Sequence, residues 1–260
     1  MRMLTFAKRC TKEILRDPLN LGFGLGFPLV LILLLSAIQA NIPVELFEIA
    51  HLTPGIAVFG LSFMTLFSAT VIAKDRSSSL LQRLYTTPMT PLDFILGYTL
   101  PMIPIALLQS IVCYAVAIIL GLPVTLNILP AIAAIIPSAL LYISIGLLCG
   151  SILTDKQVGG VCGALLTNLS AWLSGIWFDL ELVGGTFRDI AYCLPFVHAV
   201  ELERALLAGQ VSQIFPHIWG VLSYGLAILV VAILLFLNQM KQLQYNVNIM
   251  NLVKIFLYLF

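Results

Sequence analysis

Long uncharged stretches alternate with short polar segments along this chain. Residues 94–154 contain no Asp, Glu, Lys or Arg. A charge at the centre of a membrane helix costs roughly 2.5–3.5 kcal/mol on insertion scales, and a spanning helix needs about 20 apolar residues. The pattern therefore predicts an all-α membrane protein with six transmembrane helices: Leu19–Ile38, Pro54–Ala73, Leu92–Leu120, Ile128–Leu153, Val158–Phe178 and Pro216–Leu237.

Composition supports a polytopic membrane protein. The 260 residues are 60% hydrophobic and 10% charged, whereas soluble domains are about 25% charged. A net charge of +1 gives no basic excess that would indicate a nucleic-acid partner. The 5 cysteines are scattered and form no CxxC pair or Cys/His spacing. The sequence therefore predicts neither a disulfide framework nor a metal site.

The distribution of basic residues predicts the orientation. With the N-terminus in the cytoplasm, all of the 13 Lys and Arg residues fall inside except Arg188 and Arg204. This bias is the positive-inside rule. We therefore expect a multi-pass protein of a prokaryotic plasma membrane, with both termini cytoplasmic and membrane lipid around its spans.

Residues 1–17 predict an amphipathic helix. Its basic half carries Lys8, Arg9, Lys12 and Arg16, and its apolar half carries Met3, Leu4, Ala7, Ile14 and Leu15. Such a helix suits a membrane interface. It ends at Asp17-Pro18, because the residue before proline avoids the α region. Two interpretations stay open: a basic flank for the first span, or an elbow helix that touches a cytoplasmic partner.

A second short helix is predicted in the basic connector 74–91. Ser79 and Gln82 have capping-box spacing, Leu80, Leu81, Leu84 and Tyr85 form an apolar face, and Thr87-Pro88 ends it. Thr90-Pro91-Leu92-Asp93 then starts the next helix, with Thr90 as N-cap and Asp93 at the third helical position. The segment is either a well-capped connector or a surface for a partner.

The stretch 75–88 resembles the cytoplasmic motif of type-2 ATP-binding-cassette (ABC) exporter permeases. Leu81, Arg83, Leu84, Thr87 and Pro88 match that motif, while Ser79-Leu80 replaces its Gly-Thr and Gln82 its Glu. In that family the motif is the coupling helix that docks on the ATPase subunit. The resemblance implies that the ATPase-coupling residues are Ser79, Leu80, Leu81, Gln82, Arg83, Leu84, Tyr85, Thr87 and Pro88.

A second stretch, 175–205, resembles the external hairpin of the same family, with Asp179 and Gly184 in place of two prolines. Phe187–Val200 is apolar enough to enter the membrane but too short to cross it. Residues 179–215 are therefore predicted to form an external re-entrant hairpin, the alternative being a helix that lies on the outer surface.

Within the spans, Phe63, Phe67, Asn168 and Trp172 are candidates for a substrate path, with lipid-facing packing as the alternative. The spacings Gly22-x-x-x-Gly26, Gly146-x-x-x-Gly150 and Gly159-x-x-x-Gly163 let helices approach closely, most often within one chain.

No Gly-x-x-x-x-Gly-Lys-Ser/Thr motif and no HExxH motif occurs, and no set of catalytic residues is evident. We therefore predict no catalytic, cofactor or metal site; ATP would be bound by a partner subunit. The resemblance implies that residues 1–260 form one transmembrane domain of an exporter that works by alternating access. Its expected partners are a second permease copy, which would make a homodimer, or a paralogue, together with a separate ATPase. The lack of charge within the spans favours a hydrophobic or amphipathic substrate. The alternative is a membrane-embedded enzyme or a non-ABC membrane factor.

Overall fold

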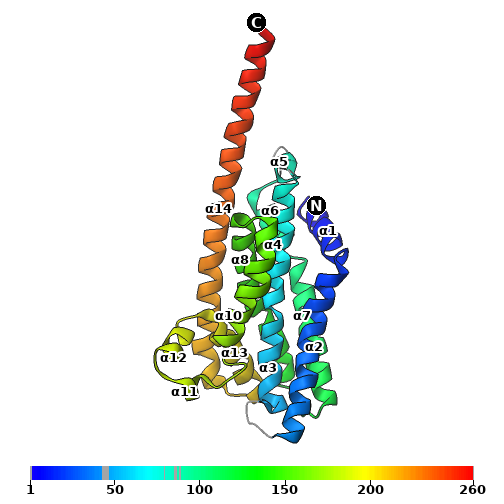
Figure 1. Cartoon of the computed structure of the whole chain (residues 1–260), viewed down its shortest axis with the longest axis vertical. Helices are drawn as coiled ribbons and strands as arrows, with labels where there is room; N and C mark the ends of the chain where they lie inside the picture. Colours follow the sequence, from blue (N-terminus) through cyan, green and yellow to red (C-terminus); the bar gives the residue numbers. More distant parts are fainter. Residues whose placement is uncertain (1, 43–46, 79, 85–86, 88, 260) are drawn as a thin grey trace.

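The computed structural model is a bundle of long helices (Figure 1). It describes residues 2–42, 47–78, 80–84, 87 and 89–259, without the side chains of Gln82 and residues 240–259. In this part of the chain, five helical stretches are long and apolar enough to cross a membrane: Pro18–Asn41, Ile49–Ser77, Pro91–Ile119, Ile128–Ile152 and Val211–Gln239. They confirm the all-helical membrane class and correspond to five of the predicted spans.

The fifth predicted span, Val158–Phe178, is not among these stretches. Its residues form α9 (Asp155–Val158), the π-helix η2 (Gly159–Leu166) and α10 (Thr167–Trp172). The wider turns begin at a pair of glycines, and glycine is about 1 kcal/mol less favourable than alanine in an α-helix. The hydroxyl group of Thr167 donates to the carbonyl oxygen of Cys162, five residues earlier, at 3.0 Å. Apolar composition alone did not reveal this irregularity.

Two of the spanning stretches contain breaks. α3 (Ile49–Gly60) and α4 (Ser62–Ser77) meet at Leu61. α6 (Pro91–Thr99) and α7 (Met102–Ile119) meet at Leu100-Pro101, where proline cannot donate a backbone hydrogen bond. α2 (Pro18–Asn41) and α8 (Ile128–Ile152) are uninterrupted.

One of the three predicted glycine spacings packs two helices of this chain together. Gly146 and Gly150 on α8 lie against the main chain of α4, where a Cβ atom would meet carbonyl oxygens at 2.6 Å (Thr65) and 2.9 Å (Ala69). By contrast, nothing within 4 Å would meet a Cβ at Gly22 or Gly26 on α2.

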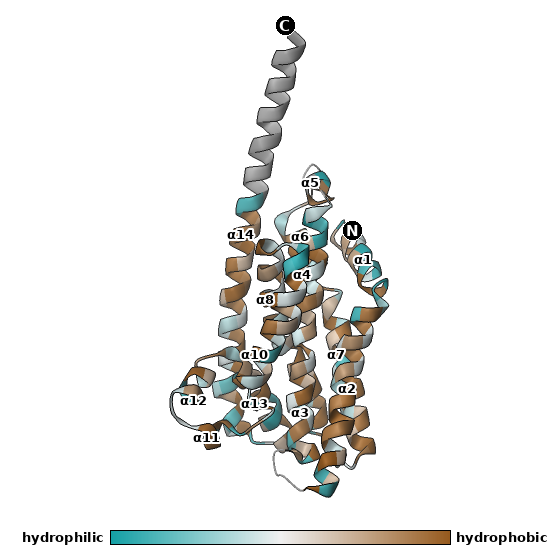
Figure 2. Cartoon of the chain, viewed as in Figure 1, coloured by the Kyte–Doolittle hydropathy of each residue, from teal (hydrophilic) through white to brown (hydrophobic). Residues whose placement is uncertain are grey.

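The short helices gather at the two ends of the bundle (Figure 1). One end carries α1 (Arg2–Leu15) and α5 (Leu80–Leu84). The other carries α11 (Leu180–Val183), α12 (Gly185–Tyr192) and α13 (Pro195–Ala208), which precede the last helix, α14 (Val211–Leu259). Hydrophobic residues cover most of the helices between these ends (Figure 2). The polar chemistry is therefore concentrated in two places.

Candidate functional site

An apolar groove of about 520 Å³ lies between α1 and the α5 segment. Its lining residues come from both: Arg2, Thr5, Phe6 and Arg9 from α1, and Leu80, Leu84, Thr87 and Met89 from residues 80–89. The two segments singled out in the sequence thus form one surface, although nothing in their local patterns predicted that they would meet.

Not all of the predicted apolar face of α5 faces this groove. Leu81 is only 2% exposed and packs in the core of this chain, whereas Leu84 is partly buried against that core and also lines the groove. Arg83 and Thr87 are exposed. The coupling candidates Ser79, Tyr85 and Pro88, and the side chain of Gln82, lie outside the described residues.

The predicted restart after this segment is confirmed. The Thr90 hydroxyl group accepts a hydrogen bond from the Asp93 backbone N–H at 3.3 Å, and the Asp93 carboxylate accepts one from the Thr90 N–H at 2.8 Å. This reciprocal capping box begins α6 at Pro91. Local chemistry therefore fixes where α6 begins.

The α1 helix forms where predicted, but its buried face differs from the predicted one. Phe6, Ala7, Cys10 and Ile14 are buried, whereas Leu4 and Leu15 are 57% and 60% exposed. Phe6 belongs to the buried face because its ring lies directly on Gly97 of α6 and packs edge-on against Phe94 and Tyr98. Lys8, Lys12 and Arg16 stay exposed, while Arg9 turns toward α4.

Arg9 belongs to a three-residue network around a buried carboxylate. Asp75 on α4 is 1% exposed and accepts hydrogen bonds from both terminal nitrogens of Arg9, that from Nη2 at 2.5 Å. The Tyr98 hydroxyl group donates to the same carboxylate at 2.9 Å. Burial opposes the charge on Arg9, but the hydrogen bond and attraction to Asp75 raise the pKa of the guanidinium above its usual value. No local pattern predicts this pairing, because 66 positions separate the partners.

The next residue, Arg76, points the other way. Its guanidinium donates to the carbonyl oxygens of Gly150 at 3.0 Å, Leu153 at 3.3 Å and Ser151. These groups lie in the last turn of α8 or directly after it, where the carbonyls of a helix have no partner within the helix. The Gln239 side chain on α14 also donates to Ser151, at 2.6 Å. Thus Asp75 binds α1 and α6, whereas the adjacent Arg76 binds the end of α8.

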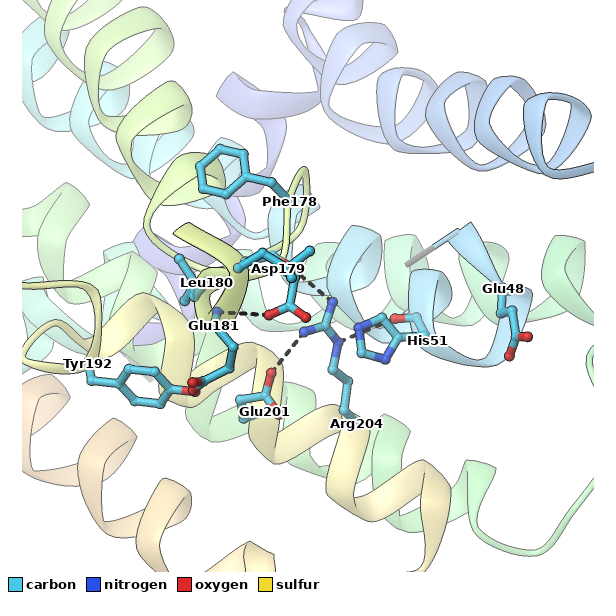
Figure 3. A pocket seen from close by; sticks show the side chains of 11 residues that line it. Glu48, His51, Phe178, Asp179, Leu180, Glu181, Tyr192, Glu201 and Arg204 are labelled. Carbon is cyan, nitrogen blue, oxygen red and sulfur yellow. Dashed lines mark hydrogen bonds and ion pairs between the residues drawn. The ribbon is translucent and has the colours of Figure 1, made fainter. Parts of the chain in front are cut away.

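A larger pocket of about 870 Å³ opens at the α11–α13 end (Figure 3). Arg204 of α13 lies at its centre and donates to the Glu201 carboxylate at 2.8 Å and to the carbonyl oxygens of Gly175 at 3.2 Å and His51 at 3.4 Å. The pocket is also lined by Glu48, Asp179 and Glu181, so that carboxylates outnumber this one arginine. Arg204 ties the predicted hairpin to the start of α3.

Glu203 is a buried acid that sequence analysis did not distinguish from its neighbours. It is 0% exposed on α13, and the Tyr114 hydroxyl group of α7 lies 3.4 Å from its Oε2 atom. No hydrogen-bond partner contacts its Oε1 atom among the described residues. Burial raises the pKa of Glu203 well above its usual value. Glu203, which lies outside the predicted spans, is thus an acid buried within the helical bundle.

The structure separates the four predicted path residues. Phe63 and Phe67, 8% and 3% exposed, are buried on α4, where Phe63 meets Phe27 and Phe67 lies on Gly24 of α2. Asn168 and Trp172 lie on α10 and are exposed. One copy of the chain does not bring all four residues to one surface.

Several long apolar helices with polar clusters at both ends define a multi-pass membrane protein. The chain belongs to the ABC-2 type transporter family, whose model matches residues 1–208. It is therefore a membrane transport permease of the ABC class, from a family that transports rather than catalyses. Permeases of this family typically pair with an ABC ATPase. A search of curated proteins found no match.

Proposed function

We propose that this chain is the transmembrane permease subunit of an ABC exporter that moves a hydrophobic or amphipathic substrate out of the cytoplasm. A separate ATPase subunit binds at the α1/α5 end and drives alternating access. The observation that carries this proposal is the groove shared by α1 and α5. A simple connector needs no apolar groove, whereas a partner that inserts an apolar projection does.

The charges around the groove favour an acidic partner surface. Arg2 lines it, as does Arg9, whose charge is already paired with Asp75. Lys8 and Lys12 on α1, and Arg16 just after its end, are exposed. Basic rims steer complementary acidic surfaces and set orientation more than affinity. The positive-inside rule also places this basic end in the cytoplasm, where ATP is available. Both termini would then be cytoplasmic, and α11–α13 would form the outer, re-entrant hairpin.

A second permease copy completes the transport unit in this proposal. Gly22 and Gly26 on α2, and Gly159 and Gly160 in η2, have open space beside them. Such small-residue surfaces let helices of two chains approach closely in a bilayer. Asn168 and Trp172, which face away from their own bundle, would then line a path between the two copies.

Co-expression with an ABC ATPase tests the proposal. The permease should copurify with the ATPase, and native mass spectrometry should show two copies of each. The permease purified alone should hydrolyse no ATP. Failure to copurify in several detergents and in lipid nanodiscs, while the permease stays folded, would contradict the proposed partner.

A further inference from the structure

The last turn of α4 is anchored on two sides through neighbouring residues. α4 ends at Ser77 and α5 begins at Leu80. Just before this junction, Asp75 accepts from α1 and α6, and Arg76 donates to the end of α8. Successive residues of an α-helix point about 100° apart, so one turn can hold neighbours on different sides. Any displacement of α5 reaches these anchors through only a few residues.

The contact of Asp75 with α1 and α6 requires a specific geometry. An arginine that binds a carboxylate through two parallel hydrogen bonds has a fixed geometry, so α1 cannot slide along α4 without breaking them. Because Asp75 is 1% exposed, water cannot replace the lost partner. Tyr98 donates to the same carboxylate, so α6 is included in this arrangement.

Apolar packing supports the contact between α1 and α6. A Cβ atom built on Gly97 of α6 would lie 2.3 Å from the Phe6 ring of α1, so this ring fills the space that a side chain at position 97 would need. The Phe6 and Tyr98 ring centroids are 4.9 Å apart. The ion pair and the aromatic contact thus hold α1 against two helices at once.

We propose that Arg9, Asp75 and Tyr98 are positioning residues that make α1, α4 and α6 move as one body when α5 is displaced. This inference rests on the proposed function, because it assigns the displacement to an ATPase bound at α5. In this proposal the three residues bind neither nucleotide nor substrate. They determine which helices move together with α5.

Distance measurements between spin labels test this inference. Lys8 on α1 and Leu92 on α6 are exposed, so Lys8→Cys and Leu92→Cys accept labels in a background with the five natural cysteines replaced. The complex with the ATPase is measured in lipid nanodiscs, without nucleotide and with ATP plus vanadate. With labels on only one of the two permease copies, we expect one narrow distance between Lys8→Cys and Leu92→Cys that nucleotide does not shift.

The double variant Arg9→Gln/Asp75→Asn removes both charges together, so that neither is left buried alone. It should broaden the distance distribution already in the absence of nucleotide and make the distance shift when nucleotide is added. Tyr98→Phe removes one hydrogen bond and should show a smaller change in the distance distribution. It replaces the double variant in the test if the double variant does not fold. Glu13→Gln is the matched control, because Glu13 pairs with the same arginine at 3.7 Å from a half-exposed position.

Two results would overturn the inference: a distance that shifts with nucleotide in the parent, or one that stays narrow and unshifted in the double variant. Loss of the ATPase from the parent complex would instead contradict the proposed function. The nucleotide-free comparison of parent and variant would still decide whether these residues hold α1 against α6.

Discussion

Gly150 of α8 lies directly against Ala69 of α4, such that a Cβ atom at position 150 would be 2.9 Å from both the Cα atom and the carbonyl oxygen of Ala69. Main-chain atoms cannot rotate away as a side chain can, so this contact sets the separation of the two helices. The close approach accompanies the reach of Arg76 from α4 to the end of α8. Helix spacing and the polar junction near α5 are therefore linked.

Substitution of Gly146 or Gly150 should destabilise the fold. Gly150→Ala and Gly146→Ala place a methyl group against main-chain atoms of α4, and overpacking of this kind typically costs about 1–3 kcal/mol. We expect a lower midpoint of thermal unfolding in detergent. Gly163→Ala is the control, because its Cβ would meet only the Leu66 side chain at 3.5 Å. Equal midpoints of thermal unfolding for the three variants and the parent would contradict the close contact between α8 and α4.

Leu84 and Leu81 should respond differently to a charge. Leu84→Asp places a carboxylate in the groove and should remove ATPase copurification and transport at near-normal protein abundance, since central interface contacts are worth more than about 1–2 kcal/mol each. Leu81→Asp should instead reduce abundance, because Leu81 is 2% exposed. Leu84→Met is the control, and Arg83→Ala should be milder, as expected for a rim charge. Normal ATPase binding by Leu84→Asp would leave the segment as a connector.

The natural cysteines provide a topology test. Cys193 is exposed near α12, so an impermeant maleimide should label it from outside intact cells, and Cys193→Ser should remove the signal. Cys10 is fully buried on α1, and burial raises the pKa of its thiol to about 12, so the reactive thiolate is scarce at neutral pH. It should stay unlabelled in the folded, purified protein. Labelling of Cys193 only after the cells are opened would invert the proposed orientation.

Glu203 should make stability depend on pH. A carboxyl group whose folded pKa lies above its ordinary value of 4.5 contributes its full stability in acid and loses it as the pH rises through the folded pKa. The thermal midpoint of the parent should therefore fall relative to that of Glu203→Gln as the pH is raised from acidic to alkaline. Glu181→Gln, at a side chain that is 54% exposed, should follow the parent. Parallel profiles for the parent and Glu203→Gln would show that Glu203 reaches water.

Local sequence patterns were enough to predict the membrane class, most of the spans, the α1 helix and the Thr90–Asp93 cap. These features depend on residues close together in the chain: an apolar run long enough for a bilayer, a helical repeat of polar positions, or a capping pair three residues apart. Tertiary structure alone decided that Arg9 pairs with Asp75, that Leu81 faces inward, that Glu203 is buried and that α1 and α5 share a groove. Each of these depends on which helix faces meet, and close packing sets that through contacts between residues distant in the sequence.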